Sequence, residues 1–298
     1  MNIVIKVDDD TKQKMIDYYK DKKREKTPPY AIFQAEEEDT IITLYESGKA
    51  MFQGTSAFVD ANMWKAIKEN DEEDKDSNDY LNTTSVGSDE VGTGDYFGPI
   101  VVTASLVKKE DLPFLQKLGC TDSKKLTDDK ILKITPEIIK KIKYKSIVIS
   151  NEEYNEKYSK ENNMNKIKAI MHNKALSLLL DEVKDKLDYI IIDEFAKENR
   201  YYSYLHEIPN VVKNITFVTK AESKNMAVAC SSIISRYIFI KEIDKLSDIY
   251  HIPLPKGSGI NVDKIGEELV EKHGKEVLSK VAKKNFSNTS RILKTRII

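Results

Sequence analysis

The chain has 298 residues, with 48 lysines and arginines against 49 aspartates and glutamates, so its net charge of −1 points to no particular class of partner. Its hydrophobic fraction of 40% is typical of a soluble protein with a sizeable core, and no apolar run is long enough to cross a bilayer. Cys120 and Cys230 are isolated, which predicts a cytoplasmic protein with no disulfide and no zinc site.

Residues 1–68 are expected to form a small α+β domain. The pattern predicts a strand over Asn2–Val7, a helix over Thr11–Arg24, three short strands within 30–54 and a closing helix over 56–68. This segment contains no cluster of catalytic residue types. It is therefore interpreted as a binding or docking module, with a purely structural role as the alternative.

An acid-rich stretch follows and predicts a solvated linker over residues 69–84. Residues 85–298 then alternate between strand and helix patterns, which favours an α/β domain built around a mixed sheet. The expected strands are Val86–Glu90, Ile100–Val107, Ile147–Ile149, 187–195 and 215–222, and the expected long helices are Met164–Val183 and Asn225–Ile243.

Four acidic residues lie where three of these strands end. Asp89 and Glu90 end the first strand, Asp193 ends the second, and Glu222 ends the third, just before a helix for which Ser223 is the expected cap. Single acids of this kind are usually solvated loop residues or caps. Four together would repel one another unless a cation compensates, and Mg²⁺ prefers a few carboxylates with water and phosphate oxygens.

Adjacent residues on a regular strand point to opposite faces, so Asp89 and Glu90 could not both reach one cation from an ideal strand. Gly87 and Gly92 flank the pair. We expect these glycines to let the backbone twist or bulge so that both carboxylates converge.

Four blocks of sequence resemble the signatures of the type 2 ribonucleases H, in the same order as in that family. The blocks are "GSDEVGTGDYFGPIVVTA" (87–104), "TDSKKLTDDKI" (121–131), "IIIDEF" (190–195) and "TKAESKNMAVACSSIISRY" (219–237). The form "DEVGTGDYFGP", with "KAES" where ribonuclease HII has "KGD", resembles the ribonuclease HIII branch in particular.

The resemblance implies an RNase H-like mixed sheet with flanking helices, preceded by a small TATA-binding-protein-like domain. It also implies cleavage of the RNA strand of RNA/DNA hybrids with Mg²⁺ or Mn²⁺; nothing in the sequence suggests more than a monomer. Two such ions would activate water and stabilise the leaving oxygen, leaving 5′-phosphate and 3′-hydroxyl ends. Carried over block by block, the metal-binding and catalytic acids are Asp89, Glu90, Asp193 and Glu222, the four residues found above.

Two departures from the family pattern bear on function, the first on substrate choice and the second on a histidine-assisted step. Ribonuclease HII has Gly-Arg-Gly where this chain has Gly92-Thr93-Gly94, and the loss of a bidentate arginine argues against removal of single ribonucleotides from DNA. In "AKKNFSNT" (282–289), Asn285 stands where a histidine is expected. No histidine of the chain is assigned to catalysis.

Basic side chains and glycines near the acids are expected to contact the substrate backbone. For the lysines the alternatives are a solvated basic loop or neutralisation of the acids, and for the glycines an ordinary turn. The expected substrate-binding residues are Gly92, Thr93, Gly94, Ser123, Lys124, Lys125 and Lys220.

Three other functions remain open from the sequence. One is a DNA-acting nuclease of related fold, and another is a protein that binds RNA/DNA hybrids without cleaving them. A phosphate-loop nucleotide enzyme is disfavoured, because no GxxxxGK[ST] pattern is present.

Overall fold

The computed structural model describes residues 2–37, 40–54, 57, 60–64, 80–120 and 123–294. The chain divides into two compact units, Met1–Asn78 and Asp79–Ile298. Residues 69–79 of the expected linker lie outside the described residues. Tyr80 belongs to the packed part of the second unit, where it is buried with its ring 5.1 Å from that of Tyr189.

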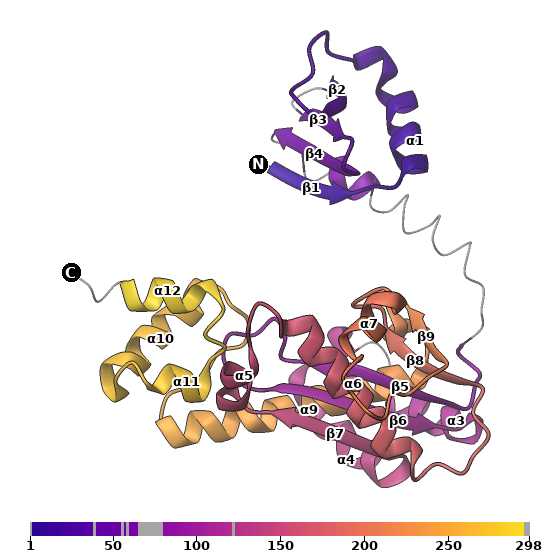
Figure 1. Cartoon of the computed structure of the whole chain (residues 1–298), viewed down its shortest axis with the longest axis vertical. Coiled ribbons are helices and arrows are strands. Elements are labelled where there is room, and N and C mark those ends of the chain that lie inside the picture. Colours follow the sequence, from indigo (N-terminus) through magenta and orange to yellow (C-terminus); the bar gives the residue numbers. More distant parts are fainter. Residues whose placement is uncertain are drawn as a thin grey trace. The chain divides into compact units, whose positions relative to one another are not determined.

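The N-terminal unit is a four-stranded antiparallel sheet of order β1-β4-β3-β2 (Figure 1). The Asp8 side chain caps the first helix by accepting from the Thr11 backbone N–H at 2.8 Å, so the helix starts before residue 11. Trp64 donates its indole N–H to the Tyr19 hydroxyl at 2.9 Å inside the core. The described elements are β1 (Asn2–Lys6), α1 (Asp9–Tyr19), η1 (Lys20–Lys22), β2 (Ala31–Glu37), β3 (Thr40–Tyr45) and β4 (Lys49–Gly54).

The second unit is built on a five-stranded mixed sheet of order β7-β6-β5-β8-β9. The central strand β5 pairs antiparallel with β6 and parallel with β8, so β5 and β8 end at the same edge. This confirms the predicted hairpin and the mixed α/β architecture. The strands are β5 (Ser85–Val91), β6 (Ile100–Val107), β7 (Lys143–Ile149), β8 (Tyr189–Asp193) and β9 (Ile215–Val218).

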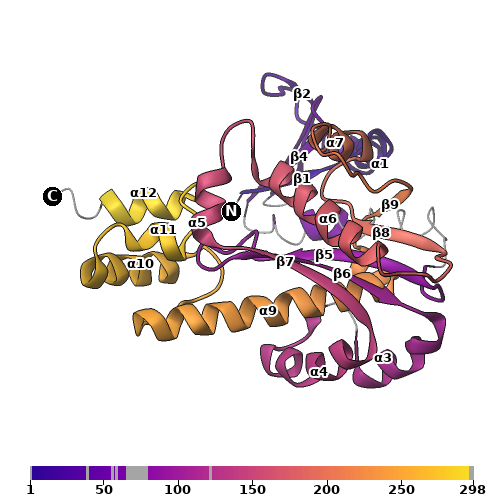
Figure 2. The same ribbon diagram turned by 60° about the horizontal axis from the view of Figure 1, so that its bottom comes forward.

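Helices cover both faces of this sheet, with α9 along one face and α6 over the other (Figure 2). On the α6 side the core combines Val86 and Val102 with Leu176, and on the α9 side it combines Val107 with Ile233. The helical elements are η2 (Lys109–Asp111), α3 (Leu112–Leu118), η3 (Ser123–Lys125), α4 (Asp128–Lys141), α5 (Asn151–Lys157), α6 (Met164–Leu180), α7 (Glu198–Tyr204), α8 (Ala221–Lys224), α9 (Met226–Tyr250), α10 (Ile260–His273), α11 (Val277–Val281) and α12 (Ser287–Lys294).

The first half of α9 lies unusually close to β5. A Cβ atom added to Gly87 would lie 2.3 Å from the backbone nitrogen of Val228, so only glycine fits there. Small hydroxyl side chains fill the rest of the contact: Ser231 donates to the Gly87 carbonyl at 2.9 Å, and Ser105 donates to the Ala227 carbonyl at 2.8 Å. The run of small residues in α9 therefore allows the close packing of helix on sheet.

The C-terminal helices support the glycine turn between β5 and β6. Phe97 forms a bridge with Ala282, and the Lys283 backbone N–H donates to the Tyr96 carbonyl at 2.9 Å. The fully buried Lys283 ammonium donates to the carbonyls of Asp95 and Gly98. Residues near the end of the chain thus fix the shape of a turn that begins at residue 92.

No helix among the described residues is long and apolar enough to span a membrane. Cys120 and Cys230 are both buried and unoxidised.

We expect Gly87→Ala to destabilise the protein by at least about 2 kcal/mol, because the added methyl group must push α9 away from β5. Gly94→Ala is the matched control, since a Cβ there meets no atom within 4 Å; its effect should stay within about 0.5 kcal/mol. Urea unfolding of both variants measures the difference, and equal stabilities would contradict the close-approach argument.

The buried Lys283 should make stability depend on pH. Burial lowers its pKa to about 7, whereas an unfolded lysine titrates near about 10.4. Between these values the unfolded state binds more protons, so the contribution of Lys283 to stability improves as the pH rises above about 7. The free energy of unfolding of the wild type, minus that of Lys283→Met, should therefore increase from pH ~6.5 to pH ~9. A difference that does not change with pH would rule this out.

Candidate active site

The four acids predicted from the sequence lie near one edge of the five-stranded sheet. Asp89 and Glu90 are near the end of β5, and Asp193 is the last residue of the adjacent parallel strand β8. Glu222 is in α8, which follows β9. Asp193 is joined to this helix directly, because its Oδ1 accepts from the Ala221 backbone N–H at 2.8 Å.

The expected strand over 215–222 is shorter than predicted, and Glu222 is not a strand residue. β9 ends at Val218, and Lys220 adopts a left-handed conformation (φ 53°) that turns the chain into the single-turn helix α8. Ser223 does not cap the long helix either. Its hydroxyl donates to the Lys220 carbonyl, while the Asn225 side chain caps α9.

Asp89 and Glu90 do not converge through a bulge. The pairing of β5 with β6 is unbroken from Ser85 to Val91, so the two side chains alternate as on a regular strand. Asp89 faces α9, where Ser232 hydrogen-bonds its carboxylate, and Glu90 faces α6. The left-handed Gly92 (φ 96°) lies beyond this paired segment and serves the turn instead.

Glu90 has two buried basic partners on α6. Lys168 donates to its Oε1 at 2.6 Å, and His172 Nε2 lies 2.9 Å from its Oε2. The other ring nitrogen of His172 lies 2.6 Å from the Ser88 hydroxyl. Burial alone would raise the pKa of Glu90, but the hydrogen bond from His172 and the charges of His172 and Lys168 lower it to about 2.

Sequence reasoning missed Lys168 and His172. Their spacing of four residues places them on one face of the helix predicted over 164–183, and both are buried in the structure. Two polar residues at helical spacing on an otherwise apolar face were a usable signal for a buried partner. Which acid they would meet depends on the packing of α6 against β5.

The other acids have fewer compensating charges. Burial raises the pKa of Asp89 well above its usual value, and the neighbouring charges of Glu90 and Glu222 raise it further. Burial also raises the pKa of Asp193, although the Ala221 N–H opposes the shift. Both shifts show that the folded protein disfavours negative charge at these positions unless a cation joins them.

Lys124 supplies one cation at this edge. Its ammonium lies 2.5 Å from Glu222 Oε1, and its side chain is 77% exposed whereas that of Glu222 is 5% exposed. The hydrogen bond to Glu222 raises the pKa of Lys124, with smaller contributions from Asp89 and Asp193. The exposed Lys124 side chain thus provides positive charge near the buried Asp89 and Glu222 and the partly buried Asp193.

The remaining predicted substrate-binding residues differ in accessibility. Ser123 is buried, with its hydroxyl 2.7 Å from that of Ser232, so its side chain faces the protein. Lys125 and Glu222 line a cavity of about 330 Å³. Gly94 and Lys220 are exposed, Thr93 is partly exposed, and Gly92 is buried with Pro99 O only 2.2 Å from where a Cβ would lie.

The four acidic residues provide carboxylate oxygens, which are the kind of ligand that hard divalent cations prefer. Within the described part of the chain, no three acidic, histidine or cysteine side chains already converge as a ready metal cage. Mg²⁺ and Mn²⁺ do not need one, because they keep water and substrate oxygens as ligands alongside one or two carboxylates. Asp89, Asp193 and Glu222 offer such oxygens on the Lys124 side, while Glu90 is engaged by Lys168 and His172.

Comparisons with known proteins identify relatives over the whole length. The family model described as Ribonuclease HII matches residues 86–289, and that of "Domain of unknown function (DUF3378)" matches residues 2–77. A ribonuclease HIII of Bacillus cereus is 40% identical, covering 98% of both chains. The crystal structure of Bst-RNase HIII in complex with Mn²⁺ is 33% identical with a TM-score of 0.71, covering 100% of this chain and 99% of that one. Aquifex aeolicus RNase H3 is 25% identical with a TM-score of 0.55, covering 96% and 100%.

Two amide variants should separate the two kinds of acid. Without divalent metal, we expect Glu90→Gln to lose about 3 kcal/mol of stability, because Lys168 would be left buried without its carboxylate. Asp193→Asn should be at least as stable as the wild type, since its charge is disfavoured in the folded state and an amide oxygen can still accept from Ala221. Urea unfolding in a chelator measures both. The reverse order of stabilities would contradict this account of the charges.

Proposed function

The chain belongs to the ribonuclease HIII branch of the type 2 ribonucleases H, and we propose that its acidic sheet edge is the site at which it cleaves the RNA strand of RNA/DNA hybrids. Ribonuclease H is a hydrolase of phosphodiester bonds. The proposal rests on one observation above all: Asp89 and Asp193 lie where the adjacent parallel strands β5 and β8 end, and Asp193 accepts from the N–H of Ala221, beside the Glu222 that pairs with Lys124.

The acidic side chains have different parts in the proposed reaction. Asp89, Asp193 and Glu222 would hold the divalent metal through their carboxylate oxygens, and Glu90, held by Lys168 and His172, would be the fourth acidic ligand. Bound Mg²⁺ or Mn²⁺, in a two-ion arrangement, supplies activation of the attacking water and stabilisation of the departing 3′ oxygen, giving 5′-phosphate and 3′-hydroxyl ends. Burial and the neighbouring acids raise the pKa of Asp89 and Asp193, and a bound cation would favour their ionised forms.

Basic and backbone groups around the acids are proposed to hold the substrate. Lys124, Lys125 and Lys220 would contact phosphate oxygens, and the exposed backbone near Gly94 allows close approach of a nucleic-acid strand. The ribose 2′-hydroxyl and the shape of the hybrid would distinguish RNA from DNA. The N-terminal unit is proposed to add a second binding surface for the hybrid.

One departure from the family pattern, Thr93, is proposed to narrow the substrate range, and the other, Asn285, to exclude a histidine-assisted step at that position. Thr93 offers no bidentate donor, so single ribonucleotides embedded in DNA should be poor substrates. The Asn285 side chain accepts from the Tyr154 hydroxyl at 3.1 Å, which gives this residue a packing role. From the two cysteines, which are isolated in the sequence, we propose a reducing compartment, the cytoplasm.

A hybrid-binding protein without catalysis is the second candidate. It is favoured by the ion pairs of Lys124 with Glu222 and of Lys168 with Glu90, because each pair gives one of the acids a structural partner. In such a protein the acids would serve only to hold these lysines.

Cleavage of a 5′-labelled RNA/DNA hybrid in Mg²⁺ or Mn²⁺ tests the proposal. We expect Asp193→Asn to lower the rate by at least about 100-fold, because the variant loses charge stabilisation needed in the transition state. Lys272→Ala, which removes an exposed lysine from a helical ion pair on α10, is the control and should cleave as the wild type does.

Matched RNA, DNA and single-ribonucleotide duplexes complete the experiment. Hybrid binding without cleavage in either metal would favour the binding protein. Cleavage of the DNA duplex at a similar rate would favour a DNA-acting nuclease instead.

A further inference from the structure

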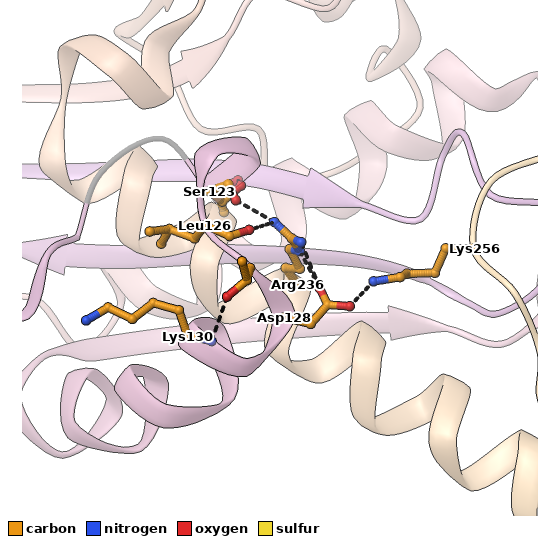
Figure 3. A network of polar contacts seen from close by, with 8 residues as sticks. Ser123, Leu126, Asp128, Lys130, Arg236 and Lys256 are labelled. Carbon is orange, nitrogen blue, oxygen red and sulfur yellow. Dashed lines mark hydrogen bonds and ion pairs between the residues drawn. The ribbon is translucent and has the colours of Figure 1, made fainter.

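The loop that carries Lys124 is anchored to α9 by one arginine, as Figure 3 shows. Arg236 Nη1 donates to the carbonyls of Ser123 and Leu126, the latter at 2.9 Å. Its Nε and Nη2 donate to Asp128 Oδ1 at 3.1 and 2.7 Å. Four hydrogen bonds from one planar group fix both ends of the 123–126 loop and the start of α4.

The same loop is anchored again one helical turn earlier on α9. The Ser123 hydroxyl lies 2.7 Å from that of Ser232, and Ser232 also hydrogen-bonds the Asp89 carboxylate. Arg236 and Ser232, four residues apart, therefore lie on the same face of α9. Helix α9 therefore fixes the position of the 123–126 loop relative to Asp89. Lys124, which belongs to this loop, pairs with Glu222.

Asp128 extends the anchor to a second loop. Its Oδ2 pairs with Lys256, so one carboxylate is shared by two cations (Figure 3). Burial would raise the pKa of Asp128, but the hydrogen bonds and charges of Lys256 and Arg236 lower it, so it stays ionised. Gly257 follows Lys256 in the chain. Its backbone N–H donates to Asp95 Oδ1, and its carbonyl accepts from the Tyr96 N–H at 2.8 Å.

These contacts form a continuous polar connection from the Lys124 loop to the glycine turn. Along it lie Arg236, Asp128, Lys256 and Gly257, and it ends at Asp95 and Tyr96. Arg236 itself is only 22% exposed at its side chain and most of its N–H donors are used. It is therefore suited to hold other residues and not to bind phosphate.

We propose that Arg236 is a positioning residue for hybrid binding: it holds the 123–126 loop so that Lys124 faces both Glu222 and the incoming phosphate backbone, and Asp128 extends this order to the loop at Lys256. The inference rests on the proposed function, because it assigns Lys124 a phosphate contact. Arg236 acts through Lys124 and touches no substrate.

A double-mutant cycle on hybrid affinity tests this coupling. The affinity of a fluorescent RNA/DNA hybrid is measured by anisotropy in a chelator, where no cleavage occurs, for the wild type, Lys124→Ala, Arg236→Ala and the double variant. Lys124→Ala should weaken binding about fivefold in the wild type but by less than about twofold in Arg236→Ala, because a misplaced loop no longer brings Lys124 to phosphate. Equal losses in both backgrounds would overturn the proposal.

Further variants separate positioning from charge and from folding. Arg236→Lys keeps the charge but cannot make the four hydrogen bonds to these three acceptor atoms, so it should reproduce the loss of coupling; full recovery of coupling would overturn the role of the planar group. If Arg236→Ala does not fold, Asp128→Asn takes its place in the cycle, with the same expectation. Lys272→Ala should leave hybrid affinity unchanged, as a control for loss of one surface charge.

The outcomes also distinguish this inference from the proposed function. A wild-type protein that neither binds nor cleaves hybrid contradicts the proposed function itself. A wild-type protein that cleaves hybrid, with additive Lys124 and Arg236 effects, contradicts the positioning role alone.

Discussion

The close approach of α9 to β5 at Gly87 is the constraint on which the site depends. Because no side chain separates the two backbones, the helix can place Ser232 against Asp89 and Arg236 against the Lys124 loop. The Asn225 cap starts the same helix immediately after α8, which carries Glu222. Helix α9, in close contact with β5, therefore positions Asp89, Lys124 and Glu222 relative to one another.

The acidic residues are divided by the sheet into two electrostatic environments. Glu90 lies on the α6 face, where Lys168 and His172 already balance its charge. Asp89, Asp193 and Glu222 share the exposed Lys124, so the negative charge exceeds the positive charge on that side. A divalent cation would stabilise the carboxylates most on this side, because they have the fewest compensating charges there.

Sequence reasoning predicted the alternation of strands and helices, the hairpin around the glycine turn and the family, because these depend on local pattern and on motif order. It was wrong about a bulge at Asp89 and Glu90, since glycine permits a bend without requiring one and the paired strands stay regular. It placed Glu222 on a strand because Lys220, a non-glycine residue, gives no sign of its left-handed turn. The partners Lys168 and Arg236 depend on long-range packing, which a single sequence does not encode locally.

The glycine turn at residues 92–98 depends on contacts from the far end of the chain. Its edges pair with Val281, Ala282 and Lys283, which follow it by more than half of the sequence. During synthesis the sheet and its acids can be in place while these residues are still unmade, because the chain grows from its N-terminus. The turn beside the acids then gains its support only when residues 281–283 emerge, so the nascent chain carries an incomplete site until that point.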